Sequence, residues 1–486
     1  MAAITERSAR ELAGAIRNRE LSAAEVVEAH IERLRRFAPR INALAADRFG
    51  RAREEAAAAD RRIAAAAPQD DLPPLLGVPF TVKESIAVAG MPNSAGLVAR
   101  REFRSPASAP TVQRLTDAGA IVLGVTNTSE LTLWIESDNR LYGRTNNPYD
   151  PSRTAGGSSG GEGAAVGSGG SPFGLASDIA GSIRIPALFC GVFGHKPSSG
   201  IVPNTGMWPP SGGTSGRMLA VGPLARRAGD LMPLLRLIAG PDGEDPLTRA
   251  AALGDPEAVS LRGLRVTTLE ETSRLPISGE LRDARERAVG ALIAAGACVR
   301  SVRLTSWRGA VMPFLATLQA GSGVESGRAT IELLEQAGEA PLTWRKLMLA
   351  GALHTAPTRV ALAAELLPDA GDSRAQRRLL AGGESIASEL IEAIGDGVLL
   401  HPAHPRVAPK HRRTYGRPWL LTPAAVFNLA GVPVTEVPLG RSQSRLPLGV
   451  QVARARPRSR FDCGGPRARA GLRRLDPARP SSRLTP

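Results

Sequence analysis

Apolar residues recur at helical spacing in three segments near the start of the chain, at residues 8–17, 22–36 and 47–66. The first two segments open with Ser8 and Ser22, and serine is a residue type that caps a helix by accepting a backbone N–H hydrogen bond. The third segment is rich in alanine. The pattern therefore predicts a helical N-terminal layer over about residues 5–66.

Short apolar runs with the character of buried strands follow this layer. The run at residues 78–83 ends at Lys83, and a helical pattern at 106–119 separates it from a second run at 120–125. Such a β-α-β rhythm is typical of a parallel sheet. Further strands are expected at residues 263–269, 298–304, 397–402, 432–439 and 448–453, and helices near 230–240, 278–295 and 423–430. The chain is therefore predicted to be an α/β protein.

Two stretches depart from this rhythm. Residues 127–161 are long, polar and rich in turn residues, and loops of that length in compact domains are usually functional. Residues 307–370 carry helical patterns with little strand signal. They are expected either to line a substrate channel or to cap the sheet.

The composition fits an ordinary globular protein, with 43% hydrophobic and 22% charged residues. The chain has no apolar run of the roughly 18 residues that a membrane-spanning helix needs, and its start does not read as a signal peptide. We therefore expect a soluble, cytoplasmic protein without a transmembrane segment. The cysteines lack metal-type spacing and are expected to be reduced thiols: Cys190, Cys298 and Cys463.

The basic residues are distributed unevenly. The last 33 residues hold ten Arg and two Asp, so +8 of the net charge of +15 lies there and the body is only mildly basic. Lysine is rare, because only Lys83, Lys196, Lys346 and Lys410 accompany the many arginines. A buried lysine can lose its proton near neutral pH, whereas arginine cannot. Lys83, at a predicted strand end, is therefore a candidate base.

The segment GGSSGGEGAAVGSGGSPFGLASDIAGSIRIP, at residues 156–186, is too apolar for a flexible linker. It lacks the phosphate-loop and dinucleotide-binding patterns. The pattern G-x-S-x-G occurs around Ser158 and Ser159, but turn sequence precedes it where a nucleophile elbow needs a strand. A Ser-His-Asp triad would need one of the six histidines, and the cluster HPAHPRVAPKH lacks a carboxylate or cysteine that would complete a metal site.

The motifs ESDNRLYGRTNNPYD, GGSSGGEGAA and GHKPSSGIVPN, with Lys83 in FTVKES and a serine in AGSIRIP, resemble the amidase signature family over roughly residues 5–452. They look most similar to the fatty acid amide hydrolase type, especially the second hydrolase of that type and its bacterial relatives. The resemblance implies an α/β amidase signature fold, with a mixed, largely parallel sheet of about eleven strands covered by helices. It also implies one amidase domain over residues 1–453.

The resemblance assigns a Ser-cisSer-Lys triad to this chain. Lys83 matches the base, Ser158 the bridging serine that follows a cis peptide bond, and Ser182 the nucleophile. The backbone N–H groups expected to form the oxyanion hole belong to Ile179, Ala180, Gly181 and Ser182. Structural support for the loop is expected from Ser159, Asp178 and Arg184. No metal or cofactor is implied.

The implied activity is cofactor-independent hydrolysis of a carboxamide through an acyl-enzyme, with a lipophilic or aryl amide as the candidate small-molecule substrate. A homodimer is possible, and no nucleic-acid partner is expected. One alternative is the glutaminase subunit of a tRNA-dependent amidotransferase. Another is an inactive amidase remnant with a basic nucleic-acid-binding tail, because Ala180 stands where the family usually has glycine.

The tail at residues 454–486 departs most from the family pattern, which calls for a short loop and a final amphipathic helix. Ten arginines, five prolines and the lack of apolar periodicity predict a segment that does not pack. Our hypothesis is a reading-frame shift near Arg454, and the alternative reading frame of the gene would then encode an amphipathic helix. A genuine basic tail that binds RNA is the rival interpretation.

Overall fold

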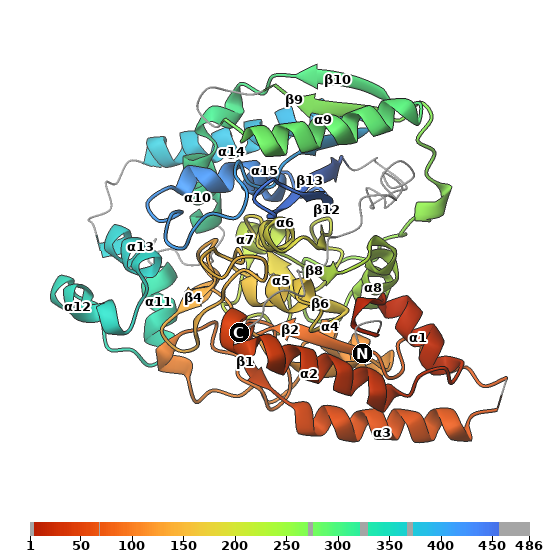
Figure 1. The fold of residues 1–486 in the computed structure, drawn as a ribbon. Helices are drawn as coiled ribbons and strands as arrows, with labels where there is room; N and C mark the ends of the chain where they lie inside the picture. Colours follow the sequence, from red (N-terminus) through yellow and green to blue (C-terminus); the bar gives the residue numbers. More distant parts are fainter. Residues whose placement is uncertain (1–3, 68, 271–275, 321–328, 367–372, 456–486) are drawn as a thin grey trace.

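A single sheet of eleven strands organises the fold (Figure 1). The computed structural model describes residues 4–67, 69–270, 276–320, 329–366 and 373–455. The expected mixed sheet of about eleven strands is confirmed. Its strands, in spatial order, are β1 (Leu44–Asp47), β3 (Ile121–Thr126), β2 (Pro79–Lys83), β6 (Phe173–Asp178), β8 (Ala220–Ala225), β7 (Phe193–Lys196), β12 (Val434–Arg441), β13 (Pro447–Arg454), β11 (Val398–His401), β9 (Arg265–Leu269) and β10 (Cys298–Val302).

Parallel pairing occurs in two groups, one on each side of the sheet. Strands β3, β2 and β6 form the first group and β11, β9 and β10 the second, while the strands between them pair antiparallel. The predicted β-α-β unit is confirmed, since α4 (Pro110–Asp117) connects the parallel strands β2 and β3. Lys83 ends β2, as expected, and lies opposite Thr126 on β3.

The helical N-terminal layer consists of α1 (Ala9–Arg17), α2 (Ala23–Ile41) and α3 (Phe49–Ala65). Ser8 and Ser22 cap the first two helices, each in a capping box with the glutamate three residues later, which satisfies two backbone donors. One detail of the prediction is wrong. Residues 44–47 form β1, an antiparallel edge strand on β3, because backbone pairing with β3 stabilises a run too short to give a strand pattern.

Helices cover the sheet along its length (Figure 1). Helix α5 (Gly160–Gly167) packs across β1, β2, β3, β6 and β8, and α6 (Arg184–Cys190) packs across β7, β12 and β13. The expected helices at 230–240, 278–295 and 423–430 are present. These are α8 (Leu231–Ile238), α9 (Gly279–Ala294) and α15 (Thr422–Leu429). The main body also contains α7 (Gly213–Met218), α10 (Val311–Ala320), α14 (Ser373–Ile394) and the hairpin of β4 (Asp138–Asn139) and β5 (Gly143–Arg144).

Three helices form a unit at the periphery of the molecule, which we call the peripheral helical unit: α11 (Ala329–Gln336), α12 (Trp344–Leu349) and α13 (Ala356–Leu366). Its leucine and isoleucine side chains form a small apolar cluster with Leu97 and Leu131 of the main body. The described part of residues 307–370 is thus helical, as predicted. That it lines a substrate channel remains a prediction.

Glu130 joins the main body to the peripheral helical unit. Its carboxylate accepts a hydrogen bond from His354 Nδ1 at 2.7 Å, from the Thr355 N–H at 2.7 Å and from Thr358 Oγ1 at 2.9 Å. His354 Nε2 lies 3.1 Å from a carboxylate oxygen of Glu339 within the unit. Although burial alone lowers the pKa of His354, hydrogen bonds to the two carboxylates raise it to about 9.

The raised pKa of His354 predicts a pH-dependent contribution to stability. The pKa of His354 is about 9 in the folded state and roughly 6.5 in the unfolded chain. Its contribution to stability is therefore fully present below about pH 6.5 and is lost as the pH rises through about 9. His354→Gln should therefore lower the melting temperature relative to the parent protein at pH 6, with a smaller difference near pH 10. A difference that is constant over this range would contradict the prediction.

None of the helices in the described residues is long and apolar enough to cross a membrane. The predicted atypical tail falls almost wholly on residues 456–486, which lie outside the described residues, so its nature remains a prediction. Strand β13 ends at Arg454, where the family-like pattern of the sequence also ends.

Candidate active site

Lys83 is buried at the carboxyl end of β2, where the parallel strands of the first group end. Its Nζ donates to Ser158 Oγ at 2.7 Å and to Ser177 Oγ at 3.0 Å. Burial lowers the pKa of Lys83 to about 7, although the carboxylates of Asp178, Glu162 and Glu84 limit the fall. A substantial fraction of Lys83 is therefore neutral near pH 7 and able to accept a proton.

Ser158 lies in the turn that precedes α5, and the peptide bond between Gly157 and Ser158 is cis. The Ser158 carbonyl accepts hydrogen bonds from Thr128 Oγ1 at 2.8 Å, Ser137 Oγ at 2.9 Å and the Ser129 N–H at 3.2 Å. A Cβ at Gly157 would lie 2.7 Å from the Trp134 carbonyl oxygen, so only glycine fits there. These contacts fix the backbone that holds the Ser158 hydroxyl beside Lys83.

Ser182 lies in the turn between β6 and α6 and retains 6% exposure. Gly181 precedes it with φ +107°, and a Cβ there would meet Ala424 Cβ at 2.4 Å, so the turn requires glycine at this position. The hydrogen bonds of the described residues join Lys83 to Ser158 but do not join Ser158 to Ser182. Ser158 thus precedes α5 and Ser182 precedes α6, and no hydrogen bond joins their hydroxyls among the described residues.

The four backbone amides expected at the oxyanion hole differ in their partners. The Gly181 N–H donates to Asp178 Oδ1 at 2.8 Å and is already engaged. The amides of Ile179, Ala180 and Ser182 have no acceptor among the hydrogen bonds of the described residues. Ala180, which stands where the family usually has glycine, is not among the described non-glycine residues with positive φ, so its side chain strains no left-handed backbone.

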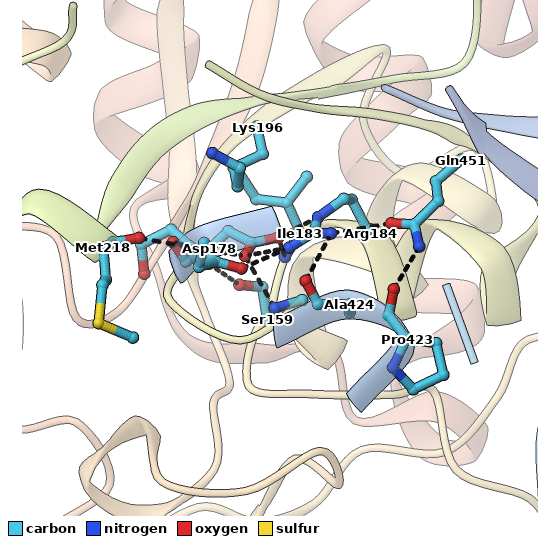
Figure 2. Close-up of polar contacts among 12 residues, drawn as sticks. Ser159, Asp178, Ile183, Arg184, Lys196, Met218, Pro423, Ala424 and Gln451 are labelled. Atoms are coloured by element: carbon cyan, nitrogen blue, oxygen red, sulfur yellow. Dashed lines mark hydrogen bonds and ion pairs between the residues drawn. The ribbon is translucent and has the colours of Figure 1, made fainter. Parts of the chain in front are cut away.

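A buried ion pair holds this turn (Figure 2). Asp178 and Arg184, expected from the sequence to support the loop, contact each other through Oδ1 and Nη2 at 2.9 Å with both side chains fully buried. Burial alone would raise the pKa of Asp178, but the Arg184 charge and its hydrogen bonds lower it well below its usual range. Ile183 N–H also donates to Asp178, at 3.1 Å, so one carboxylate fixes the backbone on both sides of Ser182.

Residues far along the chain complete this network (Figure 2). Arg184 Nη1 donates to Gln451 Oε1 at 2.8 Å and to the Ala424 carbonyl at 3.0 Å, and Nη2 donates to Asn428 Oδ1 at 2.6 Å. Ser159, expected to bond within its own loop, instead donates to the Ser177 carbonyl on β6 at 3.3 Å. The roles of Gln451, Asn428 and Ser177 were not predicted from the sequence, because nothing local marks these residues as parts of the site.

The competing sites considered from the sequence do not assemble in the described part of the chain. No histidine there hydrogen-bonds to Ser158, Ser159 or Ser182. No strand immediately precedes the double serine, as a nucleophile elbow would require. Within the described ranges, no three His, Cys, Asp or Glu side chains gather to hold a metal ion.

A family model described as Amidase matches residues 25–457. The chain belongs to the amidase signature family. The resemblance drawn from the motifs is thereby confirmed.

Relatives in the amidase signature family match most of this chain. Fatty-acid amide hydrolase 2-A of Danio rerio is 42% identical over 460 residues, which cover 92% of this chain and 84% of that protein. A glutamyl-tRNA(Gln) amidotransferase subunit of Koribacter versatilis is 31% identical over 455 residues, or 90% and 92% of the two chains. A solved bacterial aryl acylamidase has a TM-score of 0.79 over 92% of each chain at 24% identity, which shows a shared fold. Membership of this family makes the chain an amide-hydrolysing enzyme.

Proposed function

We propose that this amide hydrolase is a serine amidase that cleaves a carboxamide C–N bond through an acyl-enzyme on Ser182. The observation that carries the proposal is the 2.7 Å hydrogen bond between the buried Lys83 ammonium nitrogen and Ser158 Oγ. A lysine with a pKa of about 7 is a suitable base near neutral pH. Ser158 is the group that would relay its effect to Ser182.

In the first step, neutral Lys83 takes the proton of Ser158 Oγ, and Ser158 takes the proton of Ser182 Oγ. Ser182 Oγ forms a bond to the amide carbon, and the carbonyl electron pair moves onto oxygen. The two serine hydroxyls must come within hydrogen-bond distance for this step, and such contacts often tighten only when substrate is bound. The free amides of Ile179, Ala180 and Ser182 are available to stabilise the oxyanion.

In the second step, the C–N bond breaks as the carbonyl re-forms. The departing amine takes a proton from Ser158, which regains one from the Lys83 ammonium. Water then attacks the acyl-enzyme by the same relay, so that a carboxylic acid and free Ser182 result. These reaction steps need no metal or redox cofactor, because the two serines, Lys83, the substrate and water supply every proton and electron pair.

The proposed substrate is a lipophilic or aryl amide, since the relative that is 42% identical is named a fatty-acid amide hydrolase. Glutaminase activity within a tRNA-dependent amidotransferase is the second candidate, and the 31% identity to a chain of such an enzyme supports it less well. An inactive remnant is the third. A homodimer and a cytoplasmic location remain predictions.

The test is covalent labelling of the purified protein with a serine-directed fluorophosphonate, measured by intact mass, with the labelled peptide identified after digestion. We expect one label, on the peptide that contains Ser182. A folded protein that takes no label would overturn the proposal in favour of the remnant. Hydrolysis of long-chain and aryl p-nitroanilides, compared with release of ammonia from glutamine, then separates the two substrate classes.

A further inference from the structure

Glu162 is a fully buried carboxylate that has no part in the mechanism described above. It lies on the first turn of α5, four residues after Ser158. Oε1 accepts a hydrogen bond from Thr81 Oγ1, and Oε2 accepts one from Thr126 Oγ1 at 2.7 Å. Both donors are neutral hydroxyls, so the charge of this carboxylate is solvated but not neutralised by them.

The strand registers place Glu162 on the sheet face that carries Lys83. Thr81 lies two positions before Lys83 on β2, and alternate residues of a strand face the same side. Thr126 is opposite Lys83 on β3, and Gly174 is opposite Thr81 on β6. A Cβ at Gly174 would lie 1.6 Å from Glu162 Oε1, so the carboxylate occupies the space that the glycine leaves free.

The charged groups that face Lys83 differ in their own partners. Asp178, on β6, is paired with Arg184, which largely neutralises it. Glu84, the residue after Lys83, accepts hydrogen bonds from Ser94 and Tyr142 and lies near the Arg100 charge. For Glu162, Lys83 is the one cation among the described residues that lowers its pKa.

We propose that Glu162 is a positioning residue that supplies the negative charge for the ammonium ion formed when Lys83 takes the serine proton. This inference rests on the proposed function. The proton moves from Ser182 through Ser158 to Lys83, and Glu162 neither gains nor loses a bond. Its carboxylate stabilises a positive charge that would otherwise form in a site closed to water.

The pKa values of the two groups are consistent with this arrangement. Burial raises the pKa of Glu162 to about 7, although the two threonine hydrogen bonds and the Lys83 charge oppose the rise. Burial lowers the pKa of Lys83 to about 7, and the charge of Asp178, followed by that of Glu162, opposes that fall. Each group therefore favours the charged form of the other, and the two titrate as a coupled pair.

The test compares the parent protein with Glu162→Gln, which keeps the shape of the side chain and removes its charge. The rate constant of fluorophosphonate labelling is measured from pH 5 to pH 9. Without the carboxylate the pKa of Lys83 falls, so the acidic midpoint of the profile should move to lower pH by about one unit. The plateau rate should fall by a factor of about 3 to 10, because a base of lower pKa is weaker.

Glu436→Gln is the matched control. Glu436, on β12, is also fully buried, and burial raises its pKa well above the usual range, but Glu436 is not among the charges that shift the pKa of Lys83. We expect this variant to keep the parent midpoint. A Glu162→Gln profile with the parent midpoint, at any plateau rate, would overturn the inference and leave Glu162 a purely structural role.

Two further results distinguish a failure of the proposed function, and a failure of the variant to fold, from a failure of the inference about Glu162. A parent protein that is folded but takes no label would refute the proposed function itself, whatever the variants do. If Glu162→Gln does not fold, Thr126→Val decides instead. Removing one hydroxyl donor raises the pKa of Glu162 and reduces its negative charge, so the midpoint should shift in the same direction by a smaller amount, and an unchanged midpoint would overturn the inference.

Discussion

Replacing Ser182 with alanine should abolish fluorophosphonate labelling and reduce amide hydrolysis by a factor on the order of 10⁴ or more. The change removes the only protein atom proposed to bond to the substrate carbon, and Ser182 loses a single oxygen atom, so little packing is lost. Lys83→Met should reduce the labelling rate by a factor on the order of 10² to 10⁴, because the base is lost and the serine remains. Intact mass and hydrolysis rates measure both effects.

Ser171→Ala is the matched control for Ser182→Ala. Ser171 is fully buried just before β6, and its hydroxyl donates to the Phe173 carbonyl at 2.6 Å, away from Lys83 and the two serine turns. This variant should label at the parent rate. If Ser182→Ala still takes the label at full rate, the nucleophile lies elsewhere and the proposed role of Ser182 is wrong.

Arg184→Leu should lower the free energy of unfolding by about 3 to 5 kcal/mol, because it leaves the Asp178 carboxylate buried without its cation. The guanidinium also donates to Asn428, Gln451 and the Ala424 carbonyl, and these acceptors would be left unsatisfied. The turn that carries Ser182 should loosen as well, so labelling should slow. Urea denaturation followed by circular dichroism measures the loss of stability.

Arg303→Leu controls for the removal of a salt-bridging arginine. Its partner is Glu270, and the two side chains are 63% and 41% exposed, so solvent screens the pair. Its loss should change the free energy of unfolding by less than about 1 kcal/mol. Equal losses in the two variants would show that burial of the Asp178–Arg184 pair is not what stabilises the turn.

Elements whose signals lie within a few residues could be predicted from the amino-acid sequence alone. The serine caps of α1 and α2, the strand that ends at Lys83 and its parallel partner β3 all follow from apolar spacing and capping chemistry within a few residues. The motifs around Ser158 and Ser182 were sufficient to indicate the family. The pairing of Asp178 with Arg184 was also predictable, because the two residues are only six positions apart.

Other features depended on contacts between distant segments. The edge strand β1 has four residues and no strand pattern of its own, and it forms because β3 offers a free edge. Gln451 and Asn428 reach Arg184 across 267 and 244 positions of the chain. Glu130 meets His354 across 224 positions, in a segment whose sequence showed only helical spacing.

Glu162 is the clearest example of a residue whose environment depends on tertiary contacts. In the sequence it is one polar residue in a glycine-rich helix start, and nothing local distinguishes it from a solvated surface glutamate. Its burial depends on hydroxyls from β2 and β3 and on the space beside Gly174 of β6, which converge only when the three strands pair. The sequence thus determined which chemical groups are present, whereas the sheet register decided which charges lie close enough to act on Lys83, because electrostatic effects depend on distance and burial rather than on order along the chain.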